Sequence, residues 1–166
     1  MSTETGFLGT LQPDSIEMKK LKSLRDGIGE HYDWTPMNYP HITLIYLGKE
    51  YSDFADDTNK VPSEIKCRYG KLDFIGKSLV CKVDILDAGV RYSLDNLSGL
   101  TKYPPVPFYH ITLGRFKNSC ELKKFRENVF LGIDIDDITG KYFSIDRLSM
   151  ITVSQPDKVY KIKYHL

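Results

Sequence analysis

The chain has 166 residues, with 23 lysines and arginines against 22 aspartates and glutamates, and 41% of its residues are hydrophobic. This length and composition are typical of one globular domain, which we place over residues 1–166, and they exclude disorder as the main state. The net charge is +1, whereas proteins that bind long nucleic acids through the phosphates have a large excess of basic residues. We therefore expect no long nucleic acid as a partner.

No window approaches the roughly 18 uninterrupted apolar residues that a membrane span requires, and the N-terminus does not have the pattern of a signal peptide. Cys67, Cys81 and Cys120 fit neither a disulfide framework nor a CxxC metal site. We expect reduced thiols, a cytoplasmic location (the host cytoplasm for a viral protein), no membrane partner and a monomer.

The predicted elements begin with a strand over 6–11 and a helix capped by Asp14 or Ser15. We expect Gly27 and Gly29 to end this helix, because glycine is common just beyond helix C-termini. The remaining predicted elements, in chain order, are a polar loop over 31–36, a strand from 41, a loop over 49–62, a hairpin of 67–75 with 78–86, a short helix over 92–100, a proline-rich run over 101–107, a strand from 110, a helix capped by Ser119, and strands over 142–153 and 158–165 separated by a turn at 155–157.

One tetrapeptide, His-Ile-Thr-Leu, occurs twice in the chain. The copies begin 69 residues apart, at His41 and His110. This separation is too long for a solenoid repeat but suits two lobes of one domain. We therefore expect an α+β domain with an internal pseudo-twofold.

In a strand, alternate side chains share a face, so His41 and Thr43 lie together, as do His110 and Thr112. Of two histidines that face one site, one can accept a proton from a nucleophile while the other delivers a proton to a leaving oxygen. The threonine hydroxyls can hold the oxygens of a phosphodiester. The pattern predicts acid-base catalysis by the two histidines, with the two threonines holding the phosphate oxygens, and without a metal or a cofactor.

A single His-x-Thr on a strand is common and is usually structural. In a repeat with only a structural role, however, the apolar residues would be the same in both copies and the polar residues would differ. Two identical copies therefore favour catalysis. The acidic run at 134–137 alternates with isoleucine and has no histidine nearby, which indicates a solvated strand end or turn and no metal site.

The two motifs, with the opening strand and helix, the middle hairpin and the closing strands, resemble the 2H phosphoesterase superfamily, which is named for such histidine motifs. The resemblance covers nearly the whole chain. It implies a bilobal α+β fold in which antiparallel sheets line a central cleft with helices outside. It also implies metal-independent chemistry on phosphodiesters that involve a 2′- or 3′-oxygen.

Several residues near the motifs are candidate substrate contacts. Tyr39 and Phe108 each lie two residues before a motif histidine, where their rings can stack on a base or pack against the protein. Trp34 is either a base platform or a cover for the edge of the core. Tyr109 has the opposite parity to His110, which favours packing, and Arg115 either attracts a phosphate or is solvated.

The sequence thus predicts a phosphodiesterase that cleaves a short or cyclic nucleotide, such as a 2′,3′-cyclic phosphate, 2′-5′ oligoadenylate or a cyclic oligonucleotide signal. One alternative is a nucleotide-binding module of the same fold without turnover. Another is a structural repeat that binds a protein partner. The sequence leaves open which histidine is the base and whether water or a ribose 2′-hydroxyl is the nucleophile.

Overall fold

The computed structural model describes residues 5–9, 15–38, 40–46, 64–98, 108–145, 148–152 and 155–161. Nine strands of this part of the chain form one antiparallel sheet in the order β7-β4-β5-β6-β3-β1-β8-β9, with β2 beside β6. The strands are β1 (Thr5–Gly9), β2 (Trp34–Pro36), β3 (Ile42–Tyr46), β4 (Ile65–Ile75), β5 (Ser78–Ile85), β6 (His110–Phe116), β7 (Tyr142–Ile145), β8 (Leu148–Thr152) and β9 (Gln155–Lys161).

The strand order is symmetric about the contact between β3 and β6. Lobe A consists of β3, β1, β8 and β9, and lobe B consists of β6, β5, β4 and β7. The two motif strands occupy the innermost position of their lobes and meet through a short pairing at Ile42 and Ile111. This arrangement confirms the predicted bilobal α+β fold with an internal pseudo-twofold.

The first helix, α1 (Ile16–His31), begins at Ser15, whose hydroxyl accepts a hydrogen bond from the backbone N–H of Met18. The helix continues through Gly27 and Gly29, so the predicted end at these glycines was wrong. Burial of Met18 and Ile28 against the core outweighs the roughly 1 kcal/mol by which glycine disfavours a helix.

The helices α2 (Ala88–Ser98) and α3 (Ser119–Asn128) each start from a polar side chain, and a short 3-10 turn, η3 (Phe130–Gly132), follows α3. A carboxylate oxygen of Asp87 accepts the N–H groups of Gly89 and Val90, so α2 begins four residues before the predicted helix. The N-cap of α3 is Asn118, one residue before the predicted Ser119.

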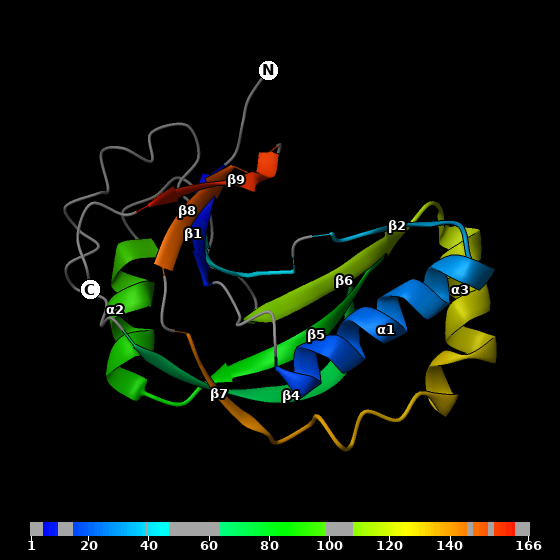
Figure 1. Cartoon of the computed structure of the whole chain (residues 1–166), viewed down its shortest axis with the longest axis horizontal. Helices are drawn as coiled ribbons and strands as arrows, with labels where there is room; N and C mark the ends of the chain where they lie inside the picture. The colour runs from blue at the N-terminus through cyan, green and yellow to red at the C-terminus, as the bar shows by residue number, and fades with distance from the viewer. Residues whose placement is uncertain are drawn as a thin grey trace.

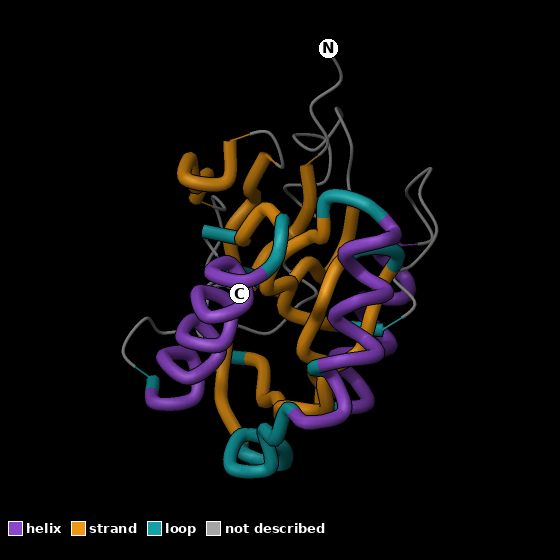
Figure 2. Tube along the Cα trace, turned by 90° about the vertical axis from the view of Figure 1, so that its right-hand side faces the viewer, coloured by secondary structure: helices purple, strands orange, loops and turns teal. Residues whose placement is uncertain are grey.

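Each long helix packs on the lobe that holds the other motif. The helix α1, which precedes the first motif, contacts β6 of lobe B and the strand β2 that pairs with β6. The helix α2, which precedes the second motif, contacts β3 as well as β5. Figure 1 shows α1 lying across β4, β5 and β6, with α2 near the lobe A strands, and in the view of Figure 2 helices flank the strands on two sides. The two lobes thus share one core.

Two further differences from the prediction concern strands. The segment predicted as a polar loop at 31–36 contains β2, because it pairs with β6 at Trp34↔Phe116. The predicted turn at 155–157 is the start of β9, an outermost strand of the sheet. A proline is tolerated there because its missing N–H can face away from the neighbouring strand.

The predicted loop at 49–62 and the proline-rich run at 101–107 lie outside the described residues. No described helix is long and apolar enough to cross a membrane.

Candidate active site

The two motifs meet across β3 and β6. Ile42 pairs directly with Ile111 in antiparallel register. Directly opposite residues share a face of the sheet, so one step from this pair places each histidine opposite the other motif's threonine. The facing positions are His41 with Thr112, and Thr43 with His110. In this register the two histidines are diagonal neighbours, whose Cβ atoms lie somewhat less than about 7–8 Å apart.

The sheet has an apolar face and a polar face at this point. Ile42 and Ile111 are completely buried on the face that we call the core face. The four residues His41, Thr43, His110 and Thr112 lie on the opposite face, which we call the motif face. Thr43 is buried, with 8% relative exposure, whereas the other three are half-buried. The site therefore offers partly shielded donors and acceptors without losing contact with solvent.

Each motif ends in a leucine that is the extra, unpaired residue of a β-bulge. On β3 the register skips Leu44, because Thr43 pairs with Leu8 and the next pair is Ile45 with Phe7. On β6 it skips Leu113 in the same way, between Val80↔Thr112 and Leu79↔Gly114. An extra residue reverses the alternation of side chains beyond it. The bulges are equivalent under the pseudo-twofold and belong to the repeat.

The imidazole of His110 is oriented by the chain just before it. Its Nδ1 lies 3.0 Å from the carbonyl oxygen of Phe108. A carbonyl oxygen only accepts hydrogen bonds, so Nδ1 carries the hydrogen and Nε2 is the ring nitrogen left to accept one. The Phe108 ring meets the His110 ring edge-on, at 5.7 Å between centroids. Phe108 therefore holds His110 through both its backbone and its ring.

Lys82 is a cation on the motif face that the sequence did not single out. Lys82 pairs with His110 across β5 and β6. Its Nζ lies 3.1 Å from a carboxylate oxygen of Asp73 and 4.7 Å from the centroid of the Phe108 ring. The backbone N–H of Phe74 and the Lys82 ammonium hold the pKa of Asp73 below its usual value. The alternation of 78–86 places Lys82 on the polar side of its strand, but only the pairing register brings it to His110.

Arg115 lies on the motif face because of the bulge at Leu113. Without the bulge, its odd number would place it with Ile111 on the core face. The structure instead buries Gly114 and Phe116 and exposes Arg115. Among the described residues Arg115 has no carboxylate partner, so its guanidinium is available to an anion near Thr112.

Trp34 lies in the core, which favours packing over the base platform, the other alternative that the sequence left open. Its exposure is 9%, and its ring packs against Phe116 at 5.3 Å between centroids. A Cβ placed on Gly114 would come within 2.8 Å of the indole, and one on Gly29 within 3.1 Å of its Nε1. The two glycines thus make room for the indole between β6 and α1, and no ring face remains for a base.

The other aromatic candidates have different positions. Tyr109 packs against the core, and burial raises the pKa of its hydroxyl to about 12. This packing is the alternative that its parity favoured. One face of Phe108 is already covered by Lys82. Tyr39 lies outside the described residues.

The acidic run forms an exposed turn, as predicted. Asp134, Asp136 and Asp137 are all exposed, and Asp137 pairs with Lys20 of α1. In the described part of the chain, no group of three or more His, Cys, Asp or Glu side chains is placed to hold a metal ion. His31 is exposed at the end of α1, and His165 lies outside the described residues.

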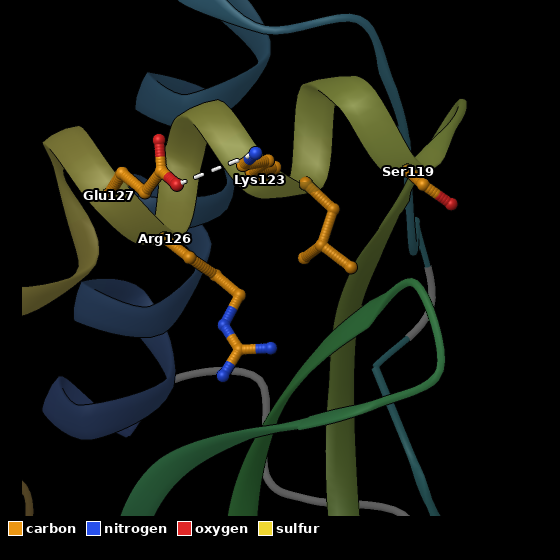
Figure 3. A pocket seen from close by; sticks show the side chains of 5 residues that line it. Ser119, Lys123, Arg126 and Glu127 are labelled. Atoms are coloured by element: carbon orange, nitrogen blue, oxygen red, sulfur yellow. Dashed lines mark ion pairs between the residues drawn. The ribbon is translucent and has the colours of Figure 1, made fainter.

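A surface pocket of about 380 Å³ lies away from the motifs. Figure 3 shows the α3 side chains that line it, with Lys123 beside Glu127 at 4.0 Å. Arg126 extends from the same helix over the ring of Phe74, 5.0 Å from its centroid. None of the lining residues belongs to a motif.

No protein-family model and no curated relative matches the sequence. The solved structures with a similar fold include the following three. The MHV ns2 PDE domain is 15% identical, with a TM-score of 0.52, over 91% of this chain and 99% of that chain. TT0787 of Thermus thermophilus is 12% identical, with a TM-score of 0.55, over 98% of this chain and 100% of that chain. E. coli LigT in its apo form is 12% identical, with a TM-score of 0.54, over 91% and 87%.

At these identities the likeness to the three structures is one of fold. The likeness covers nearly the whole chain, including both lobes. The protein therefore has the 2H phosphoesterase fold, as its two motifs led us to expect.

Proposed function

We propose that this protein is a metal-independent phosphodiesterase that cleaves short or cyclic nucleotides. The observation that carries the proposal is the direct pairing of Ile42 with Ile111, whose register, continued by one residue on each side, places each histidine opposite the other motif's threonine. In that register the Cβ atoms of the two histidines are somewhat less than about 7–8 Å apart. Their imidazoles can therefore reach opposite sides of one phosphate group.

In the proposed reaction the neutral histidine accepts a proton from the attacking oxygen. This oxygen belongs to water or to the ribose hydroxyl beside the phosphodiester, which is the 2′-hydroxyl of a 3′-5′ linkage or the 3′-hydroxyl of a 2′-5′ linkage. The oxygen forms a bond to phosphorus, and the bond from phosphorus to the leaving oxygen breaks. The protonated histidine gives its proton to that leaving oxygen. One proton is taken up and one is released, so each turnover exchanges the protonation states of His41 and His110.

The threonines stabilise the charge that develops on the phosphate. Thr43 and Thr112 lie opposite the histidines, so their hydroxyls can donate to the two oxygens that do not change partners. The exposed Arg115 adds a cation on the same face. For His110 the hydrogen bond from Nδ1 to Phe108 directs Nε2 to the reaction.

The fold neighbours support the same class of chemistry. One of them is named as a PDE domain. A fold alone hosts many functions, so the proposal depends on the motif residues and not on the likeness. The substrates we propose are 2′,3′-cyclic phosphates, 2′-5′ oligoadenylate and cyclic oligonucleotide signals.

A product screen tests the proposal. The protein is incubated in EDTA with 2′,3′-cyclic mononucleotides, 2′-5′ oligoadenylate and cyclic dinucleotides, and the products are identified by mass spectrometry. The matched blank is the His41→Ala/His110→Ala double variant prepared in the same way. We expect at least one substrate to be cleaved by the parent and not by the blank. Because hydrolysis adds one water and transesterification adds none, the product masses also identify the nucleophile.

A binding module without turnover is the alternative function. It would bind one of these nucleotides in calorimetry while the screen shows no product. Activity that is lost in EDTA and restored by a divalent ion would contradict the metal-independent mechanism.

A further inference from the structure

The position of Lys82 extends the site beyond the two motifs. Lys82 on β5 lies directly opposite His110 on β6, and β3 borders β6 on the other side. Residues directly opposite each other share a face, so Lys82 lies on the motif face. Across the sheet the order is therefore His41, His110 and Lys82, with the lysine on the far side of His110 from His41.

This order separates Lys82 from the phosphate that reacts. A phosphate held by both histidines lies between β3 and β6. The strand β5 is then one and a half strand spacings away, or about 7 Å. In a nucleotide chain the next phosphate lies across one ribose, at a comparable separation. Lys82 is thus placed for the phosphate beside the reacting one.

The ammonium of Lys82 is held in place and still has a donor to offer. Asp73 accepts at 3.1 Å, and the Phe108 ring lies under the cation at 4.7 Å. Asp73 is itself fixed, because its carboxylate also accepts the backbone N–H of Phe74 at 2.8 Å. An ammonium has three N–H donors, so these contacts leave capacity for a phosphate oxygen.

We propose that Lys82 binds a second phosphate of the substrate, next to the one that reacts. The inference rests on the proposed function and narrows its substrate class to nucleotides with at least two phosphates joined through a ribose, either linear or cyclic. Phe108 is a positioning residue in this arrangement, because it contacts both Lys82 and His110.

Equilibrium binding of two nucleotides tests the inference directly. Adenosine 3′,5′-bisphosphate carries two phosphates across one ribose, whereas adenosine 5′-monophosphate carries one. Calorimetry compares the parent with Lys82→Met, with Lys82→Arg, and with Lys123→Met as a control that removes one charge from the exposed face of α3. We expect Lys82→Met to weaken the bisphosphate about 10- to 100-fold, as for a charge-assisted hydrogen bond, and the monophosphate less than about 3-fold. Lys82→Arg should retain most of the bisphosphate affinity, and Lys123→Met all of it.

The outcomes separate this inference from the proposed function. Equal weakening of both nucleotides by Lys82→Met, or equal weakening by Lys123→Met, overturns the second-phosphate site. If the bisphosphate depends on Lys82 but the product screen shows no cleavage, the site stands and the proposed activity fails. If cleavage occurs and neither nucleotide depends on Lys82, the activity stands and the site fails. Binding of neither nucleotide by the parent overturns the site.

Discussion

Ile42 and Ile111, the second residues of the two motifs, pair directly with each other across β3 and β6, and both are completely buried. The pseudo-twofold passes between these two side chains. Because the histidines and threonines flank this pair on the other face of the sheet, the packing of two isoleucines sets the register of the candidate active site.

Shortening either isoleucine should destabilise the protein. We expect Ile42→Val and Ile111→Val each to lower the free energy of unfolding by about 0.5–1.5 kcal/mol. The two effects should not be additive, because the side chains are direct neighbours. Urea denaturation of both single variants and the double variant measures the coupling. Ile16→Val is the control, since Ile16 is 67% exposed on α1 and should change stability by less than about 0.5 kcal/mol.

The motif histidines should show the opposite behaviour, with large effects on rate and small effects on stability. We expect His41→Ala and His110→Ala each to lower the rate by about 10²–10⁴-fold. The double variant should lose much less than the product of the two, because the histidines act as one unit. Thr43→Ala and Thr112→Ala should be milder, since proton transfer remains possible.

Turnover and thermal melting of these variants are measured together, with His31→Ala on the exposed end of α1 as the control. Histidine variants that fold poorly, or that fold well and keep full activity, would show that the repeat is structural.

Three glycines should respond differently to alanine. A Cβ on Gly114 would lie 2.8 Å from the Trp34 ring, so Gly114→Ala should lower the free energy of unfolding by about 1–3 kcal/mol. Gly27 is inside α1, and a Cβ added there would meet nothing within 4 Å. Gly27→Ala should therefore raise the free energy of unfolding by about 0.4–1 kcal/mol. Gly29→Ala should gain less than Gly27→Ala, because its Cβ would lie 3.1 Å from Nε1 of Trp34. Thermal melting ranks the three, and a stabilised Gly114→Ala would contradict the buried position of Trp34.

The cysteines should differ strongly in reactivity. Burial raises the pKa of the Cys67 and Cys81 thiols to about 12, whereas Cys120 is exposed. A raised pKa leaves almost no thiolate at about pH 8, and the thiolate is the form that reacts. We expect iodoacetamide to modify Cys120 in the folded protein, and Cys67 and Cys81 only after denaturation. Peptide mass spectrometry reads out each site, and rapid labelling of Cys67 in the native protein would contradict its burial.

The sequence predicts what depends on local pattern. The repeated tetrapeptide indicates the paired lobes, and the alternation at 67–75 and 78–86 indicates the hairpin that forms β4 and β5. The polar and apolar faces of both motifs were also predictable, because the alternation of side chains along a strand assigns them without any knowledge of the tertiary structure.

What depends on register between distant segments could not be predicted. Arg115 reaches the motif face only because the sheet skips Leu113, and Lys82 meets His110 only through the pairing of β5 with β6. Trp34 is buried because Gly29 and Gly114, which are far apart in the chain, come together around its ring. Such approaches are properties of the tertiary structure and leave no local signal.

The crossed packing of the helices has a consequence for how the protein folds. Lobe B is continuous in sequence, but the helix that covers it, α1, is made earlier as part of the segment that carries β1 and β3. Conversely, β3 is covered by α2 from within the stretch that builds lobe B. Each lobe is therefore covered in part by a helix from the segment that builds the other lobe. Unfolding should therefore be a single cooperative transition, and a chain cut between the lobes should regain structure only when both fragments are mixed.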